Sequence, residues 1–277
     1  AERSNWMLLN DRFPHADDQA FGQAYLDLYL EDKKPVRMAD TKAIMDRLIV
    51  RPDDPDKLLW WWCDALFMSP PVLLRLYEIT HDKKYLDYMD HEWWLTSASL
   101  YNQENHLYFR DSRYFTQKQA NGKPIFWSRG NGWVMGGLVR MLDNMPEDYP
   151  DRKRFEDLYR RMAAKIVTLQ NADGTWHAAL LDPQSYPVKE ASGTGFYCYA
   201  LAYGINHGLL SYKKYHESVE KAWNALVGCM QTNGKLGYVQ QIGEKPEKVT
   251  ADDTETYGVG AFLLAGSEVY RMLQKHK

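Results

Sequence analysis

The chain has 277 residues, a formal net charge of −3 and 45% hydrophobic residues, which is enough for one large domain with its own core. The nearly balanced charge and the absence of a basic run exclude a typical nucleic-acid-binding protein. No apolar stretch of the sequence is long enough to span a membrane. We therefore expect neither a nucleic acid nor a membrane as a partner.

Nine helical patterns follow one another along the chain, without a continuous strand pattern. They cover about 17–29, 38–49, 64–77, 84–100, 130–145, 152–169, 192–209, 213–230 and 255–273. In the third of these, Pro70 and Pro71 are expected in the first turns of the helix, where a missing N–H group costs little. The sequence therefore predicts an all-α protein.

The helical patterns alternate between two kinds. Every other one begins with a polar or glycine-rich cap and is rich in small and apolar residues, such as Gly136 and Gly137, as is typical of helices buried all round. The intervening ones carry a charged face, and short aromatic strands follow three of them. Inner and outer helices with their connecting loops on one rim describe an α/α toroid.

A toroid of six hairpins needs twelve helices, and the first and the last of the nine patterns are both of the inner kind. We therefore expect residues 1–277 to form a single α/α toroid catalytic domain that lacks its N-terminal helices. The inner face should then be open between the first and last helices of the chain.

The aromatic content is unusual, with 10 Trp and 19 Tyr, and three tryptophans, Trp60 to Trp62, stand just before Asp64. An Asp in this position ordinarily caps a helix. Adjacent side chains point in different directions, however, so at least one tryptophan should line an open surface beside the carboxylate. Aromatic rings beside an acid favour a sugar-binding cleft, and apolar walls raise the pKa of a proton donor.

Two further groups of residues stand at the starts of inner helices. Arg129 lies between Trp127 and Trp133, and its guanidinium can bind a substrate carboxylate or pair structurally with an acid across the rim, namely Asp64 or Asp18. The pair Asp17-Asp18 offers one acid beyond an ordinary cap. The three cysteines are odd in number and lack metal-ligand spacing, so we expect reduced core thiols, no metal and no cofactor.

Three segments carry a resemblance to a known family: 62–68 (WCDALFM), 127–133 (WSRGNGW) and 17–23 (DDQAFGQ). In this order and spacing they resemble glycoside hydrolase family 105, the unsaturated rhamnogalacturonyl hydrolases, which are related to the unsaturated glucuronyl hydrolases of family 88. The resemblance covers nearly the whole chain, and segment 127–133 is its most specific part. It implies an (α/α)6 barrel.

The resemblance also implies roles for individual residues. Asp64 matches the general acid/base, and Asp18 matches a second essential acid, with Asp17 as the weaker match. The substrate-binding candidates are Trp62, Met68, Arg110, Trp127, Arg129, Trp133, Asp17, Trp176 and His177. Arg110 departs from the family pattern, because some members carry a His on this rim strand, and this leaves the neighbouring sugar open.

The implied substrate is an oligosaccharide, left by a polysaccharide lyase, with a 4,5-unsaturated uronic acid at its non-reducing end. Asp64 would protonate C4 of the vinyl ether and then activate water to attack C5, while Asp18 would keep Asp64 protonated through like-charge coupling. Two alternatives stay open. One is an ordinary inverting glycosidase on the same toroid, and the other is a carbohydrate-binding protein without catalysis.

Overall fold

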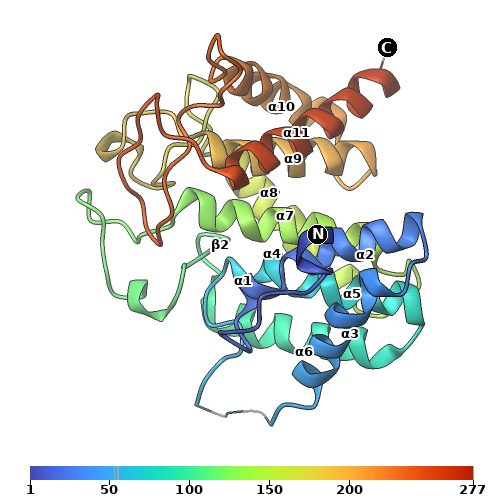
Figure 1. The fold of residues 1–277 in the computed structure, drawn as a ribbon. Helices are drawn as coiled ribbons and strands as arrows, with labels where there is room; N and C mark the ends of the chain where they lie inside the picture. The colour runs from blue at the N-terminus through green and yellow to red at the C-terminus, as the bar shows by residue number, and fades with distance from the viewer. Residues whose placement is uncertain (53, 55, 277) are drawn as a thin grey trace.

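The computed structural model describes residues 1–52, 54 and 56–276, and most of them lie in α-helices (Figure 1). The helices are α1 (Ala16–Gln19), α2 (Phe21–Glu31), α3 (Val36–Ile49), α4 (Ala65–Met68), α5 (Pro70–Thr80), α6 (Lys83–Leu100), α7 (Ser128–Asn144), α8 (Arg152–Val167), α9 (Ala191–Asn206), α10 (Tyr212–Val227) and α11 (Thr256–Lys275). Strands β1 (Tyr101–Asn102) and β2 (Leu107–Tyr108) form a short antiparallel pair. Three 3-10 turns complete the described elements: η1 (Glu2–Ser4), η2 (Ser112–Tyr114) and η3 (Pro183–Ser185). The prediction of an all-α protein is confirmed.

All nine predicted helical patterns are helices in the structure, and two of them are broken once. The first pattern is divided at Ala20 into α1 and α2, and the third is divided at Ser69 into α4 and α5. The second break has a clear cause, because Pro70 and Pro71 open α5. A proline can begin a helix but cannot donate the backbone bond that would continue the preceding one.

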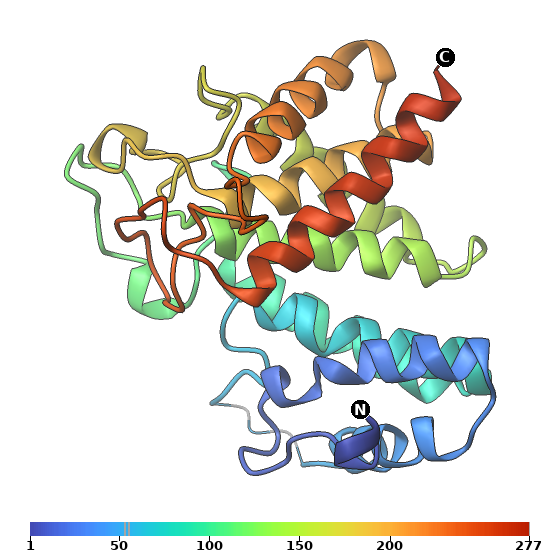
Figure 2. The same ribbon diagram turned by 45° about the horizontal axis from the view of Figure 1, so that its top comes forward.

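The alternation of inner and outer helices is confirmed. The inner helices α2, α5, α7, α9 and α11 pack one against the next, and α3, α6, α8 and α10 each pack on the outside of one of them (Figure 2). Helices α7 and α9 are buried on nearly all faces, whereas α8 and α10 bury one stripe and expose charged residues.

The small residues of the inner helices are explained by close packing. A Cβ atom added at Gly137 of α7 would collide with the backbone carbonyl of Leu66 in α4. One added at Gly195 of α9 would lie 2.9 Å from the Cβ of Ala261 in α11. Glycine therefore lets neighbouring inner helices approach more closely than a larger residue would.

The inner helices form an arc that is open between α2 and α11. Phe21 on α2 and Leu263 on α11 expose large apolar side chains. A cavity of about 360 Å³ lies between these ends of the arc, lined by residues of α2 together with Phe67, Arg140 and Leu264.

The loops that precede the inner helices gather at one end of the molecule, as predicted. Figure 1 shows segments 109–127, 177–190 and 237–255 together at the left, beside the starts of α7, α9 and α11. Within the part of the chain that the structure describes, no helix is long and apolar enough to cross a membrane.

Candidate active site

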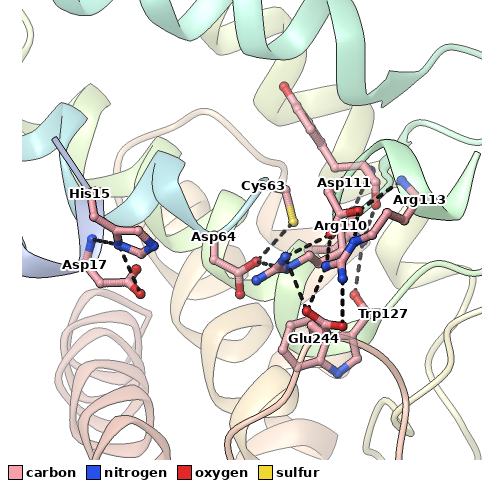
Figure 3. A network of polar contacts seen from close by, with 11 residues as sticks. His15, Asp17, Cys63, Asp64, Arg110, Asp111, Arg113, Trp127 and Glu244 are labelled. Atoms are coloured by element: carbon pink, nitrogen blue, oxygen red, sulfur yellow. Dashed lines mark hydrogen bonds and ion pairs between the residues drawn. The ribbon is translucent and has the colours of Figure 1, made fainter. Parts of the chain in front are cut away.

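Asp64 stands directly before α4, but its carboxylate accepts no capping hydrogen bond, so the capping role is wrong. The residue is 7% exposed. Its Oδ2 atom lies 3.6 Å from Sγ of Cys63 and 3.7 Å from Nε of Arg110 (Figure 3). The structure therefore leaves this acid available for chemistry.

Burial raises the pKa of Asp64 above its ordinary value, against the opposing charges of Arg110 and Arg129. A raised pKa keeps the acid protonated closer to neutral pH, as a general acid requires. The sequence predicts that apolar surroundings raise this pKa, and burial is its leading cause. The additional like-charge coupling with Asp18 stays a prediction.

The three consecutive tryptophans divide as expected between core and surface. Trp60 and Trp62 are buried, whereas Trp61 is 44% exposed. The ring of Trp62 lies between Trp61 and His15, with centroid separations of 4.8 and 4.5 Å. Trp61 and Trp62 also line a cavity of about 260 Å³. The open aromatic surface beside Asp64 is therefore that of Trp61, which the sequence did not single out.

Arg110 is held beside Asp64 by main-chain contacts. The backbone N–H of Cys63 donates to the carbonyl of Arg110 at 2.8 Å. Two residues earlier, the buried side chain of Asn131 accepts from and donates to the backbone of Tyr108, which ties this strand to α7. The Arg110 guanidinium lies over the Trp61 ring, with its carbon 5.2 Å from the ring centroid. Arg110, which stands where some members of the resembled family carry a His, thus places a cation beside Asp64.

Arg129 is hydrogen-bonded to backbone carbonyls. It is 2% exposed, and its Nη1 and Nη2 atoms donate to the carbonyls of Gln240 and Gln241 at 2.6 and 2.8 Å. Its guanidinium lies over the rings of Trp127 and Tyr257, at 4.4 and 4.6 Å from their centroids. Arg129 therefore anchors segment 240–241, and its role as a receptor for a substrate carboxylate stays a prediction.

The aromatic candidates Trp127, directly before α7, and Trp133, on α7, are both buried. Trp127 is buried, and its Nε1 donates to Oε1 of Gln240 at 2.9 Å. Trp133 packs against Phe67 and Phe196, and the partly buried Met68 joins the same cluster. Roles for Trp127, Trp133 and Met68 in lining a sugar pocket stay predictions.

The adjacent acids Asp17 and Asp18 of α1 lie in different environments. Asp18 is buried, and Arg12 binds it with both its backbone N–H and its guanidinium, Nε lying 3.1 Å from Oδ1. The side chain of Asp17 is 43% exposed. Figure 3 shows His15 and Asp17 on one side of Asp64 and Arg110 on the other. The roles of Asp18 and Asp17 as further acids of the site stay predictions.

The two rim-strand candidates have partners elsewhere. Trp176 is fully buried and donates from Nε1 to the carbonyl of Ile166 at 2.8 Å. Both ring nitrogens of His177 lie 3.3 Å from acceptors, on Pro183 and Asp173. The full burial of Trp176 contradicts its predicted substrate contact, and the contact predicted for His177 stays a prediction. Among the described residues, no group of three or more His, Cys, Asp or Glu side chains could hold a metal ion.

The sequence model of the family described as Glycosyl Hydrolase Family 88 matches residues 2–273. The chain belongs to glycosyl hydrolase family 88. It is therefore an enzyme that hydrolyses glycosides, and its substrate is a carbohydrate. The resemblance read from the motifs, to family 105 and its relative family 88, is confirmed, and family 88 is the one whose model matches.

Individual members of the family are similar over nearly the whole chain. A protein of Formosa agariphila named unsaturated 3S-rhamnoglycuronyl hydrolase is 44% identical over 287 residues, which cover 97% of this chain and 76% of the relative. A protein of Alteromonas sp. (strain LOR) with the same name is 37% identical and is covered to 70% of its length. The solved structure of a family 88 glycosyl hydrolase from Bacteroides vulgatus has a TM-score of 0.92 and 33% identity, with 98% of this chain and 83% of that chain covered.

In this family 88 enzyme, several polar residues of the site were missed by sequence reasoning. Asp111 and Arg113 follow Arg110 directly, so the local run Arg-Asp-x-Arg was the available signal. Glu244 and Gln240 lie more than a hundred residues further along the chain, in a segment without a helical pattern. Their place at the site follows from the fold, because hydrogen bonds from Arg113 and Arg129 bring that segment to it.

Proposed function

We propose that the enzyme removes the terminal 4,5-unsaturated uronic acid from lyase-generated oligosaccharides, with a rhamnose as the next sugar. The observation that carries the proposal is the buried carboxyl of Asp64 beside the cation Arg110, which itself lies over the exposed ring of Trp61. The relatives named unsaturated 3S-rhamnoglycuronyl hydrolase, at 44% and 37% identity, support this substrate class.

In the proposed reaction Asp64 acts first as a general acid and then as a general base. Asp64 donates its proton to C4 of the vinyl ether, and positive charge develops at C5 and the ring oxygen. Water attacks C5 and transfers a proton to the Asp64 carboxylate, which restores the acid. The resulting hemiketal opens, the bond between C1 and the bridging oxygen breaks, and the keto acid and the shortened oligosaccharide separate. An ordinary inverting or retaining glycosidase attacks C1 with two carboxylates instead.

Arg110 is the residue we assign to the carboxylate of the unsaturated sugar. Its Nε atom is buried and without a hydrogen-bond partner among the described residues, and a guanidinium binds a carboxylate at two points. The ring of Trp61 lies under the same guanidinium and offers a face for the flat unsaturated sugar. We assign the neighbouring cavity of about 260 Å³, which Trp61 also lines, to the sugar beyond it.

The environment of Asp18 does not offer the base that the inverting alternative needs. An inverting glycosidase needs a free second carboxylate to act as the base. The carboxylate of Asp18 is already bound by Arg12. Asp17 is exposed, and its Oδ2 atom lies 3.6 Å from Nδ1 of His15. We assign Asp17 to the orientation of sugar hydroxyls or of the attacking water.

The test compares two disaccharides of a uronic acid linked to rhamnose, one unsaturated and one saturated. We expect the enzyme to consume the unsaturated compound, with loss of the absorbance of the conjugated double bond and release of a keto acid. The saturated compound should stay intact, because it offers no vinyl ether to protonate. Cleavage of both compounds would show an ordinary glycosidase, and binding without consumption would show a carbohydrate-binding protein.

A further inference from the structure

Two arginines and two acids form a connected cluster beside Asp64 (Figure 3). The buried carboxylate of Asp111 stands at its centre. It accepts from Nη1 of Arg110 at 2.8 Å, and from Nε and Nη2 of Arg113 at 2.9 Å each. These hydrogen bonds hold the pKa of Asp111 below its ordinary value although burial acts in the opposite direction. Asp111 is therefore an anion and fixes both cations.

Glu244 completes the cluster from a distant part of the chain. Its two carboxylate oxygens accept from Nη1 and Nη2 of Arg113 at 3.1 and 2.7 Å. Its Oε2 atom also lies 3.7 Å from Nη1 of Arg110. The hydrogen bonds from Arg113 hold the pKa of Glu244 below its ordinary value, so this residue too is an anion.

The segment that carries Glu244 is anchored at the start of α7. Gln240 is buried, its carbonyl accepts from Arg129, and its side-chain oxygen accepts from Trp127. Its Nε2 atom donates to the carbonyl of Lys245 at 2.8 Å, which holds the turn around Glu244. The position of Glu244 therefore depends on Arg129 and Trp127, through their hydrogen bonds to Gln240.

The charges of this cluster act on the proton of Asp64. The cations Arg110 and Arg113 face the anions Asp111 and Glu244, and the nearby thiol of Cys63 is uncharged because burial raises its pKa. Arg110 and, from the start of α7, Arg129 favour the ionised form of Asp64. The two anions offset part of this positive charge and so favour the protonated form.

We propose that Glu244 is a positioning residue of the active site, which offsets part of the charge of Arg110 beside Asp64. The inference rests on the proposed role of Asp64. Without Glu244 the positive charge near Asp64 increases, and a positive charge favours the ionised form of Asp64. Asp64 would then lose its proton at a lower pH, and the site would lose its acid earlier.

Three variants test the inference. Glu244→Gln removes the charge with little change of shape, Glu244→Asp keeps the charge, and Glu247→Gln makes the same change at an exposed position of the same segment. We expect the falling limb of kcat against pH to move to lower pH by about 0.5 in Glu244→Gln, which is about a threefold loss of proton affinity at Asp64. Glu244→Asp and Glu247→Gln should keep the parent limb. At acidic pH, where Asp64 is protonated in every variant, kcat of Glu244→Gln should stay within about twofold of the parent.

A second readout does not depend on the substrate. The carbon-13 resonance of the Asp64 carboxyl group, followed against pH, should report the same lowered pKa in Glu244→Gln. An equal fall of kcat at every pH, with the Asp64 titration unchanged, would show that Glu244 only fastens the segment and would overturn the inference. A parent enzyme that does not consume the unsaturated disaccharide would instead refute the proposed function, and the titration would still decide the role of Glu244.

Discussion

Nε of Arg110 lies 3.7 Å from Oδ2 of Asp64, and it donates no hydrogen bond to any residue that the structure describes. The cation is thus in ion-pair contact with the acid without a hydrogen bond between them. A closer pair would hold Asp64 ionised, because a hydrogen-bonded guanidinium stabilises the carboxylate. The observed separation leaves the effect of burial dominant, so that the pKa of Asp64 is raised.

Replacement of Arg110 by glutamine should move the pH profile in the direction opposite to that of Glu244→Gln. Arg110 lowers the pKa of Asp64, so its loss raises that pKa further. The falling limb of kcat should therefore move to higher pH. KM should rise by about tenfold or more, because a charged hydrogen bond to the substrate carboxylate contributes about 1.5–3 kcal/mol. The measurement is kcat and KM from acidic to alkaline pH, and an unmoved limb would contradict the electrostatic role of Arg110.

Replacement of Asp17 should lower activity, whereas replacement of the adjacent Asp18 should lower stability. Asp17→Asn should lower kcat by about tenfold through lost orientation, while the exposed position keeps the change in stability within about 0.5 kcal/mol. Asp18→Asn should lower the free energy of unfolding at neutral pH by about 1–2 kcal/mol, because it breaks the pair with Arg12.

Urea unfolding and kcat of both variants provide the measurement. Asp18→Asn should leave the falling limb of the pH profile in place, since burial rather than Asp18 dominates the pKa of Asp64. If Asp18→Asn instead moves the falling limb of kcat to lower pH without a change in stability, the result would show the like-charge coupling that the sequence predicted.

The arrangement of helices could be predicted from the sequence because its signals are local. Apolar spacing and caps place each helix within a few residues, and runs such as Gly136-Gly137 mark the inner ones. The break at Ser69 escaped because the apolar pattern continues through it, although the prolines beside it already indicated a helix start.

The partners of the site residues could be predicted only in part. Asp64 and its raised pKa follow from the aromatic run before it. The contacts of Arg129 could not be predicted, because its partners are the backbone carbonyls of Gln240 and Gln241. Every residue has a backbone carbonyl, so the sequence does not indicate which carbonyls an arginine binds. Glu244 was missed for a related reason, since its pair with Arg113 spans 131 positions of the chain.

Arg129→Lys should loosen the segment that it anchors. A lysine ammonium cannot reach both carbonyls with the geometry of the guanidinium fork, so stability should fall by about 2 kcal/mol. Amide hydrogen exchange should accelerate in 237–255. Arg140→Lys on the same helix is the matched control, because Arg140 contacts Gln23 and Asp27 and should leave exchange in 237–255 unchanged. Equal exchange in both variants would contradict the anchoring role.

A pair of glycines tests the close packing of the inner helices. Gly137→Ala should destabilise the protein by about 1–3 kcal/mol, because the new methyl group meets the Leu66 carbonyl. Gly260→Ala places a methyl group in open space on α11 and should stabilise the helix by up to about 1 kcal/mol. Thermal unfolding of the two variants gives the comparison. A Gly137→Ala protein as stable as the parent would show that α4 and α7 are not in close contact.

The central claim is that Asp64 both donates the proton and later receives one from water, and Asp64→Asn tests it most directly. Asparagine is nearly isosteric but cannot supply the proton, so kcat on the unsaturated uronyl-rhamnose disaccharide should fall by about 10²–10⁴-fold. KM and the unfolding temperature should stay close to those of the parent, because Trp61 and Arg110 remain in place. A variant that retains near-parental turnover would contradict the assignment of Asp64 and the mechanism built on it.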